Sequence, residues 1–237
     1  VLVENVHFTE EINSSEDVGW KAITTNLSDL AASGSEDFLG FTVGLIAPPA
    51  TQWKWVEGVY KGMQKAINQF GGKLIGGDCS KGKEKILSIT AIGKLGELRL
   101  HRSNALPGDY LVSSGAHGLS RLGLALLRHE SLEELKIIPE SLRLKAIKTH
   151  QRPYPQIEAL KLLTKCKPSN LPWRAAGIDS SDGLLEAVNS LCISSKCKAI
   201  LNKSCIPIDK HWPKGSFWDN WCLTGGEDYQ LIISLPP

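Results

Sequence analysis

The first 92 residues alternate between helical and extended hydrophobic patterns, and this alternation constrains the fold more than any other feature of the chain. Apolar side chains recur at steps of three and four over residues 53–70, which indicates an amphipathic helix ended by Gly71-Gly72. A second helical pattern, over residues 20–30, follows a capping box of Ser14 with Asp17. Strand candidates cover residues 1–3, 41–46, 73–75 and 86–92. The order strand, helix, strand, helix, strand, strand predicts an α/β or α+β domain.

A polar turn around Pro107-Gly108 separates two apolar segments and is the best boundary candidate. A strand over 110–112 and further helical patterns follow it. With 237 residues and 42% hydrophobic composition, the chain can build two small cores. We therefore expect an N-terminal domain over residues 1–106 and a C-terminal domain over residues 107–237.

Both ends of the sequence suggest a longer protein. The only methionine is Met63, so Val1 is not expected to be a natural start. A strand candidate at residues 231–234 runs directly into Pro236-Pro237. We expect missing segments at both ends.

Composition excludes several classes of function. The net charge of +2 is spread along the chain without a basic run, so nucleic acid is not an expected partner. No apolar run reaches the roughly 18 residues of a membrane helix. The six cysteines form no Cys-x-x-Cys pair, which favours reduced thiols over a zinc or redox motif. These features predict a cytoplasmic protein without a membrane partner.

Three acidic motifs linked to glycine are the main functional signal: Gly76-Gly77-Asp78, residues 179–183 (DSSDG) and residues 225–228 (GGED). Each follows a strand or a strand approach, so its carboxylates are expected at a strand end, where glycine lets a ligand come close. Magnesium prefers oxygen ligands and is commonly held by one or two carboxylates together with substrate phosphates. The motifs therefore predict a site for a magnesium nucleotide.

Each motif also has a structural interpretation. Gly-Gly-Asp is a common turn, and Ser181 or Asp182 could cap a helix, which contributes about 1 kcal/mol. A cap needs only one oxygen, whereas Asp179 and Asp182 together would repel each other without a cation. Asp228 fits a solvated turn, and Glu227 has the better claim to a ligand.

Three single residues are also candidates for a site. His7, at the end of the first strand, could be a partly buried histidine, which is the commoner outcome. Arg102 could be a surface residue or a phosphate contact, for which its guanidinium is suited. Asp29 lies beside the buried stripe of its helix and shares a face with Asn26.

Other catalytic signatures are absent. The sequence contains no Walker A spacing and no Gly-x-Gly-x-x-Gly that opens a helix. It also lacks His-Glu-x-x-His and Gly-x-Ser-x-Gly. Zinc proteases and nucleophilic hydrolases are therefore disfavoured.

Seven blocks in order along nearly the whole chain resemble the thiamine-monophosphate kinase family, within the aminoimidazole ribonucleotide synthetase-like superfamily. They are Leu2–Phe8, Asn26–Ala32, Leu74–Asp78, His101–Ser103, Pro107–Asp109, Asp179–Leu184 and Thr224–Tyr229. The resemblance implies an N-terminal α/β domain that dimerises through its sheet, a C-terminal α/β domain, and ATP between them. It further implies direct in-line transfer of the ATP γ-phosphate to thiamine monophosphate, without a phosphoenzyme.

The resemblance also assigns residues. Asp29, Asp78, Asp179 and Asp182 would hold several Mg²⁺ ions, and we expect them to converge on one pocket, within a chain or across a two-fold partner. ATP would contact Gly77, Asp78, Arg102 and Ser181. Thiamine monophosphate would contact His7 and Glu227. The expected assembly is a homodimer.

The chain departs from the family pattern in a few places, and two alternatives stay open. Lys81 stands where the family usually has arginine, and the family's upstream acids and C-terminal aromatic residue lie outside the chain. One alternative is a superfamily enzyme with another acceptor, a selenophosphate or purine-precursor synthetase. The other is a non-catalytic nucleotide-binding module.

Overall fold

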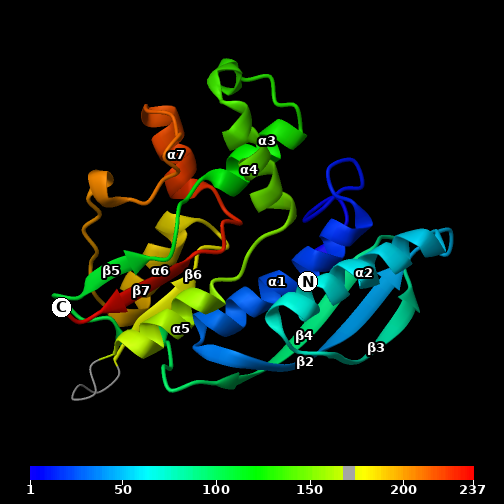
Figure 1. Cartoon of the computed structure of the whole chain (residues 1–237), viewed down its shortest axis with the longest axis horizontal. Coiled ribbons are helices and arrows are strands. Elements are labelled where there is room, and N and C mark those ends of the chain that lie inside the picture. The colour runs from blue at the N-terminus through cyan, green and yellow to red at the C-terminus, as the bar shows by residue number, and fades with distance from the viewer. Residues whose placement is uncertain (168–173) are drawn as a thin grey trace.

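Two β-sheets with helices packed against them make up the computed structural model, which describes residues 1–167 and 174–237 (Figure 1). The first sheet has the order β1-β4-β2-β3. β2 pairs in parallel with β3 and antiparallel with β4. The strands of this first sheet are β1 (Leu2–Val3), β2 (Ser35–Ala47), β3 (Leu74–Lys81) and β4 (Ile86–Leu95). The predicted α/β class is confirmed.

Helices α1 (Ser15–Ala32) and α2 (Trp53–Phe70) lie on one face of this sheet and leave its other face, here called the outer face, uncovered (Figure 1). The predicted capping box starts α1, with the Asp17 amide donating to Ser14 Oγ at 3.2 Å. Gly71 ends α2 at φ 98°, a conformation that favours glycine. The two helices approach closely at Gly62, where a Cβ would lie 1.9 Å from the Glu16 carbonyl oxygen.

The second sheet is antiparallel, in the order β5-β7-β6. Its strands are β5 (Tyr110–Ser113), β6 (Ala176–Asp179) and β7 (Leu231–Leu235). Helix α6 (Leu184–Ser195) packs Leu184, Val188 and Leu191 against Ile178 and Ile232 of this sheet. The other helices are α3 (Leu119–Leu127), α4 (Glu140–Gln151), α5 (Ile157–Cys166) and α7 (Ser216–Thr224), with 3₁₀ turns at Arg102–Asn104, Glu133–Ile137 and Lys203–Cys205.

One hydrophobic core extends across the predicted boundary at residue 106. It joins Phe41 and Leu87 of the first sheet to Leu160 of α5 and Leu231 of β7. Helix α1 lies at the centre of this core, and its Trp20 Nε1 donates to the Pro153 carbonyl oxygen at 2.9 Å. The division into residues 1–106 and 107–237 remains a proposal. Helix α1 belongs to the first part and also packs against the second.

The Gly-Gly-Asp motif is not at the tip of its strand, as the sequence suggested. β3 continues through it to Lys81 because the parallel ladder with β2 continues, with Asp78 beside Gly44. Gly77 has a packing role here, since a Cβ would lie 2.2 Å from the Val43 carbonyl oxygen.

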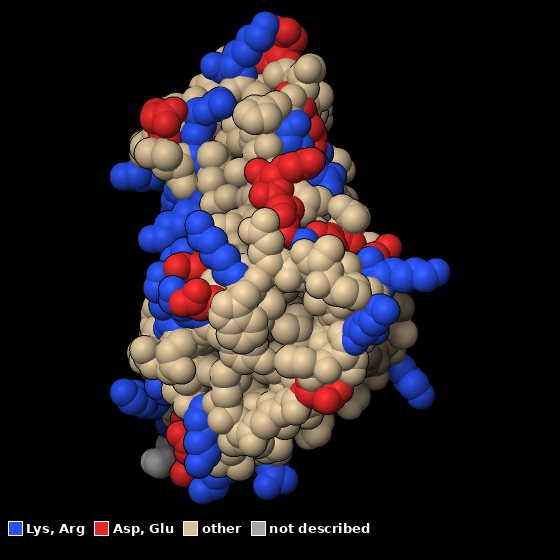
Figure 2. All heavy atoms as spheres, turned by 90° about the vertical axis from the view of Figure 1, so that its right-hand side faces the viewer, with Lys and Arg blue, Asp and Glu red and all other residues tan. Residues whose placement is uncertain are grey.

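No helix in the described part of the chain is long and apolar enough to cross a membrane. Figure 2 shows one end of the molecule, where basic and acidic side chains are interspersed around an area without charged residues. On this end the charges do not gather into a single-sign patch, which agrees with the dispersed charge of the sequence.

Candidate functional site

Two of the predicted metal ligands meet where α1 passes β6. Asp29 of α1, Asp179 of β6 and Arg102 line one cavity of about 370 Å³. Both oxygens of the Asp179 carboxylate are oriented by hydroxyls. Ser28 Oγ donates to Oδ2 at 2.6 Å, and Ser181 Oγ donates to Oδ1 at 2.9 Å. Asp29, Asp179, Arg102 and Ser181 are thus brought together.

This acidic pair suits a divalent cation. Desolvation and, second, the charge of Asp179 raise the pKa of Asp29 to about 6, although Asp29 is an exposed residue. A cation between the two carboxylates would relieve that repulsion. Within residues 1–167 and 174–237, no group of three or more His, Cys, Asp or Glu side chains is arranged for a metal ion. Two neighbouring carboxylates fit a Mg²⁺ ion that takes its remaining ligands from phosphate and water.

A second cavity, of about 330 Å³, contains both predicted substrate residues, His7 and Glu227. Glu227 is held by Lys21, whose Nζ lies 2.7 Å from Glu227 Oε1 while only 1% of the lysine side chain is exposed. His150 Nδ1 lies 3.3 Å from the other oxygen, Oε2. Burial lowers the pKa of His150 to about 4, so the imidazole is neutral at pH 7. Lys21 is therefore the charged partner of Glu227.

Arginines give the second cavity a basic wall. Arg121 and Arg128 both line it. Arg121 is fixed by two hydrogen bonds to Glu130, of 3.0 and 2.9 Å, and by stacking 4.3 Å from the Trp221 ring centroid. A cavity with a fixed carboxylate and a basic wall can bind a ligand that carries both a cation and an anion.

Helix α1 connects the two cavities through a buried polar stripe made of Lys21, Thr24 and Ser28. Lys21 contacts Glu227 at one end and Ser28 contacts Asp179 at the other. Sequence reasoning missed Lys21 and Ser28. The available signal was the spacing of Lys21, Thr24 and Ser28, which stand at positions i, i+3 and i+7 on an otherwise apolar helix face.

The Gly-Gly-Glu-Asp motif has a special backbone. Glu227 and Tyr229 adopt φ values of 66° and 50°, a region that is strained for residues other than glycine. Asp228 is buried and accepts from the amides of Gly118 at 2.6 Å and Ser120 at 2.8 Å, at the start of α3. The interpretation of Asp228 as a solvated turn acid is therefore wrong, because its buried carboxylate caps α3, a helix about 110 residues earlier in the sequence.

Tyr229 is a further residue that the sequence reasoning missed. Burial, followed by the charges of Glu227, Asp179, Asp29 and Asp182, raises the pKa of Tyr229. The ring is buried next to Asp228, in the segment that carries Glu227. Asp182 is exposed just before α6 and does not line either cavity.

Asp78 and Gly77 lie apart from these cavities. Cys79 interacts with Tyr60 of α2, so the alternating neighbour Asp78 lies on the outer face of the sheet. Ser80 Oγ donates to Asp78 Oδ2 at 2.7 Å on that face. Asp29 is on the helix-covered side. Within one chain, the four predicted metal ligands do not converge, because the sheet separates Asp78 from the others.

The mixed sheet and its acid-lined cavities agree with a family match over the first part of the chain. Residues 1–95 match the family described as AIR synthase related protein, N-terminal domain. Over residues 1–95, the fold and this match define an α/β domain of the AIR synthase-related class.

Relatives over the whole chain narrow this class. A thiamine-monophosphate kinase of Prochlorococcus marinus is 57% identical over 237 residues, covering 100% of this chain and 71% of the relative. One of Synechococcus elongatus is 37% identical over 238 residues, with the same two coverages. The solved thiamine monophosphate kinase from Aquifex aeolicus has a TM-score of 0.83 and 32% identity, covering 99% of this chain and 76% of that one. The chain belongs to the thiamine-monophosphate kinase family.

Proposed function

We infer that the protein transfers the γ-phosphate of ATP to thiamine monophosphate, giving thiamine diphosphate and ADP. The observation that carries this inference is the pair of cavities at the two ends of the α1 polar stripe, one lined by Asp29 and Asp179, the other by His7 and Glu227. A solved complex of AaThiL with AMPPCP and TMP matches 99% of this chain and 73% of that one, at 31% identity and a TM-score of 0.84. A nucleotide and a thiamine phosphate therefore suit the two cavities.

The residues divide the work between binding and orientation. We assign one Mg²⁺ to the pair Asp29 and Asp179 and a separate Mg²⁺ to Asp182, with Arg102 and Ser181 toward the ATP phosphates. When bound, Mg²⁺ neutralises phosphate charge. Glu227, held by Lys21, is assigned to the thiamine cation, with His7 beside it. Direct phosphoryl transfer needs mainly positioning and charge neutralisation, which this arrangement can provide without a nucleophilic side chain.

We also propose that a second copy packs on the outer face of the first sheet. This face carries Ser88, Thr90 and Ile92 of β4, all exposed, and Asp78 of β3, with β2 between the two strands. Dimerisation there would cover these groups and offers Asp78 and Gly77 a route to the nucleotide of the partner copy. Separately, we propose a cytoplasmic location.

A product assay tests the reaction. The protein is incubated with MgATP and thiamine monophosphate, and thiamine diphosphate is quantified by chromatography. We expect product from this acceptor and none with selenide or a purine-precursor acceptor. Asp29→Asn should reduce turnover at least about 100-fold, whereas Asp37→Asn, an exposed acid on β2, should leave it unchanged. Product with another acceptor alone would refute the assignment, and nucleotide binding without any product would favour the non-catalytic alternative.

A further inference from the structure

Two cysteines lie next to each other at the C-terminal end of α6, outside both cavities of the proposed active site. The amide of Cys197 donates to the Cys192 carbonyl oxygen at 3.0 Å, and that of Lys196 donates to Ile193 at 3.3 Å. Lys196 has the left-handed conformation, φ 56°. These features form a Schellman motif, in which the side chains six residues apart, counting both ends, are brought into contact.

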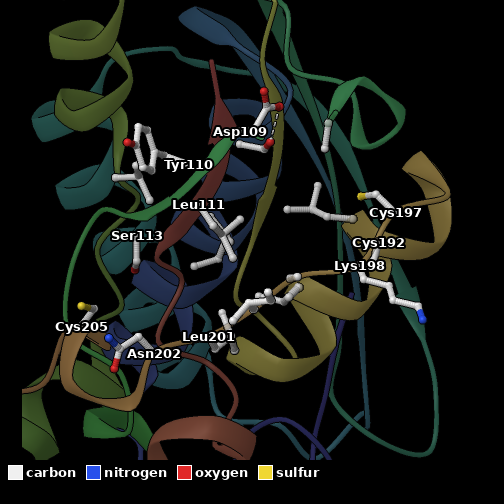
Figure 3. A pocket seen from close by; sticks show the side chains of 18 of the residues that line it. Asp109, Tyr110, Leu111, Ser113, Cys192, Cys197, Lys198, Leu201, Asn202 and Cys205 are labelled. Carbon is white, nitrogen blue, oxygen red and sulfur yellow. Dashed lines mark hydrogen bonds between the residues drawn. The ribbon is translucent and has the colours of Figure 1, made fainter. Parts of the chain in front are cut away.

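The geometry permits a disulfide. Standard backbone dimensions on either side of the 3.0 Å hydrogen bond hold the two Cα atoms within about 7 Å, the upper limit for bridging. Both cysteines are partly exposed and line the same cavity of about 590 Å³, beside β5 and α6 (Figure 3). Burial and, second, the neighbouring Cys192 thiol raise the pKa of Cys197. The two thiols therefore line the same cavity and lie close enough to interact.

The same helix end holds the turn that carries Arg102. Ser195 lies between the two cysteines in sequence, and its Oγ accepts from the Ala105 amide at 3.0 Å and donates to the Arg102 carbonyl oxygen at 2.7 Å. The Arg102 guanidinium also donates to Ser190 Oγ of α6 at 3.4 Å. A change in the last turn of α6 thus reaches Arg102 directly through Ser195, and the preceding turn contacts it through Ser190.

We propose that Cys192 and Cys197 are a site of reversible thiol oxidation, and that their disulfide displaces Arg102 and weakens nucleotide binding. The oxidant is a low-molecular-weight disulfide such as oxidised glutathione. One cysteine thiolate attacks it and releases one thiol, and the second cysteine thiolate then displaces the other thiol. The two cysteines together lose two protons and two electrons, and the oxidant is reduced to two thiols. The effect on nucleotide binding rests on the proposed function, whereas the disulfide does not.

Peptide mapping tests the disulfide. The native protein is treated with oxidised glutathione, blocked with an alkylating agent and digested with trypsin without reduction. Cleavage after Arg174, Lys196 and Lys198 would release residues 175–196 linked to the dipeptide Cys197-Lys198. We expect this linked pair in the wild type and in Cys205→Ser, whose thiol lines the same cavity, and its loss in Cys192→Ser and in Cys197→Ser. Its absence from the native wild type, or formation only in denaturant, would overturn the proposal.

Titration with a nonhydrolysable MgATP analogue tests the connection to Arg102. Oxidation should weaken the affinity of the wild type by about 5-fold or more, and reduction should restore it. Cys197→Ser should show the reduced wild-type affinity under both conditions. Equal affinities of mapped, oxidised wild type and of reduced wild type would refute the effect on Arg102, whereas failure of all forms to bind would count against the proposed function instead.

Discussion

At the scale of single residues, the raised pKa of Asp29 makes cation binding depend on pH. The ionised carboxylate binds Mg²⁺, and with a pKa of about 6 this carboxylate becomes protonated as the pH falls through 6. We expect Mg²⁺ affinity to fall about tenfold between pH 7.5 and pH 5, measured by calorimetric titration with the metal alone. Asp29→Asn should bind weakly with little pH dependence, and an equally steep profile in that variant would contradict the assignment.

The same shift has a consequence for stability. Because the folded pKa lies above the usual 3.8, the native protein binds more protons than the unfolded chain between about pH 4 and pH 6. Without Mg²⁺, the contribution of Asp29 to the free energy of unfolding therefore decreases as the pH rises through this window. Added Mg²⁺ should offset the decrease above pH 6.

Lys21 allows a second prediction at this scale. Lys21→Met keeps the side-chain volume but leaves Glu227 without its buried cationic partner. We expect about tenfold weaker binding of thiamine monophosphate and a loss of about 1–3 kcal/mol in unfolding free energy, since Glu227 retains 30% exposure to water. Calorimetry and urea denaturation measure the two effects. Lys65→Met, which removes an exposed partner of Glu16, should change stability by less than about 1 kcal/mol. Similar losses in both variants would contradict a special role for Lys21.

Most of what could be predicted about the site came from the residue types in the acidic motifs. They pointed to Asp179 and Glu227, while Asp29 was predicted from the polar face of its helix, and the structure places these residues along two cavities. Lys21 was not found because a single lysine within a helix is usually solvated, and only tertiary contact with Glu227 explains its burial.

At the scale of elements, the close approach of α1 and α2 predicts a strong effect of one methyl group. Gly62→Ala places a Cβ 1.9 Å from the Glu16 carbonyl oxygen, so the helices must separate. We expect a loss of about 2–4 kcal/mol, measured by urea denaturation. Gly44→Ala is the matched control, because its Cβ would meet Ser88 at an ordinary 3.5 Å. Equal stability of the two variants would refute the close packing.

Local periodicity was enough to predict the helices, but not the length of β3. The pattern over residues 53–70 and the capping box at Ser14 are local signals, and both helices were confirmed. The continuation of β3 through Gly77 depends on its parallel partner β2, about 30 residues earlier in the sequence. A local sequence window contains no information on that pairing.

At the scale of the whole molecule, the outer face of the first sheet predicts a dimer that can be disrupted. Ile92 is 42% exposed there, and Ile92→Asp would put a charge into the proposed interface. We expect sedimentation to show a dimer for the wild type and a monomer, or at least about tenfold weaker association, for the variant. Trp53→Asp removes a 75% exposed aromatic side chain from the helical side and should remain dimeric. A monomeric wild type at high concentration would refute the interface.

Convergence of the acids was the expectation that depended most on topology. Asp29 and Asp179 are 150 positions apart in sequence and meet because α1 passes β6. Asp78 remains on the far side of its sheet, and only pairing and side-chain alternation reveal this. Motif spacing cannot distinguish these two cases.

The central position of α1 limits how members of this family could be recombined. Trp20 reaches the Pro153 carbonyl, Asp17 pairs with Arg152, and Ser28 holds Asp179. A chimaera that exchanged the segment after residue 106 for that of a distant homologue would have to reproduce all three of these contacts with α1. Crossover points that respect the α1 neighbourhood, rather than the polar turn at Pro107, should give the viable hybrids.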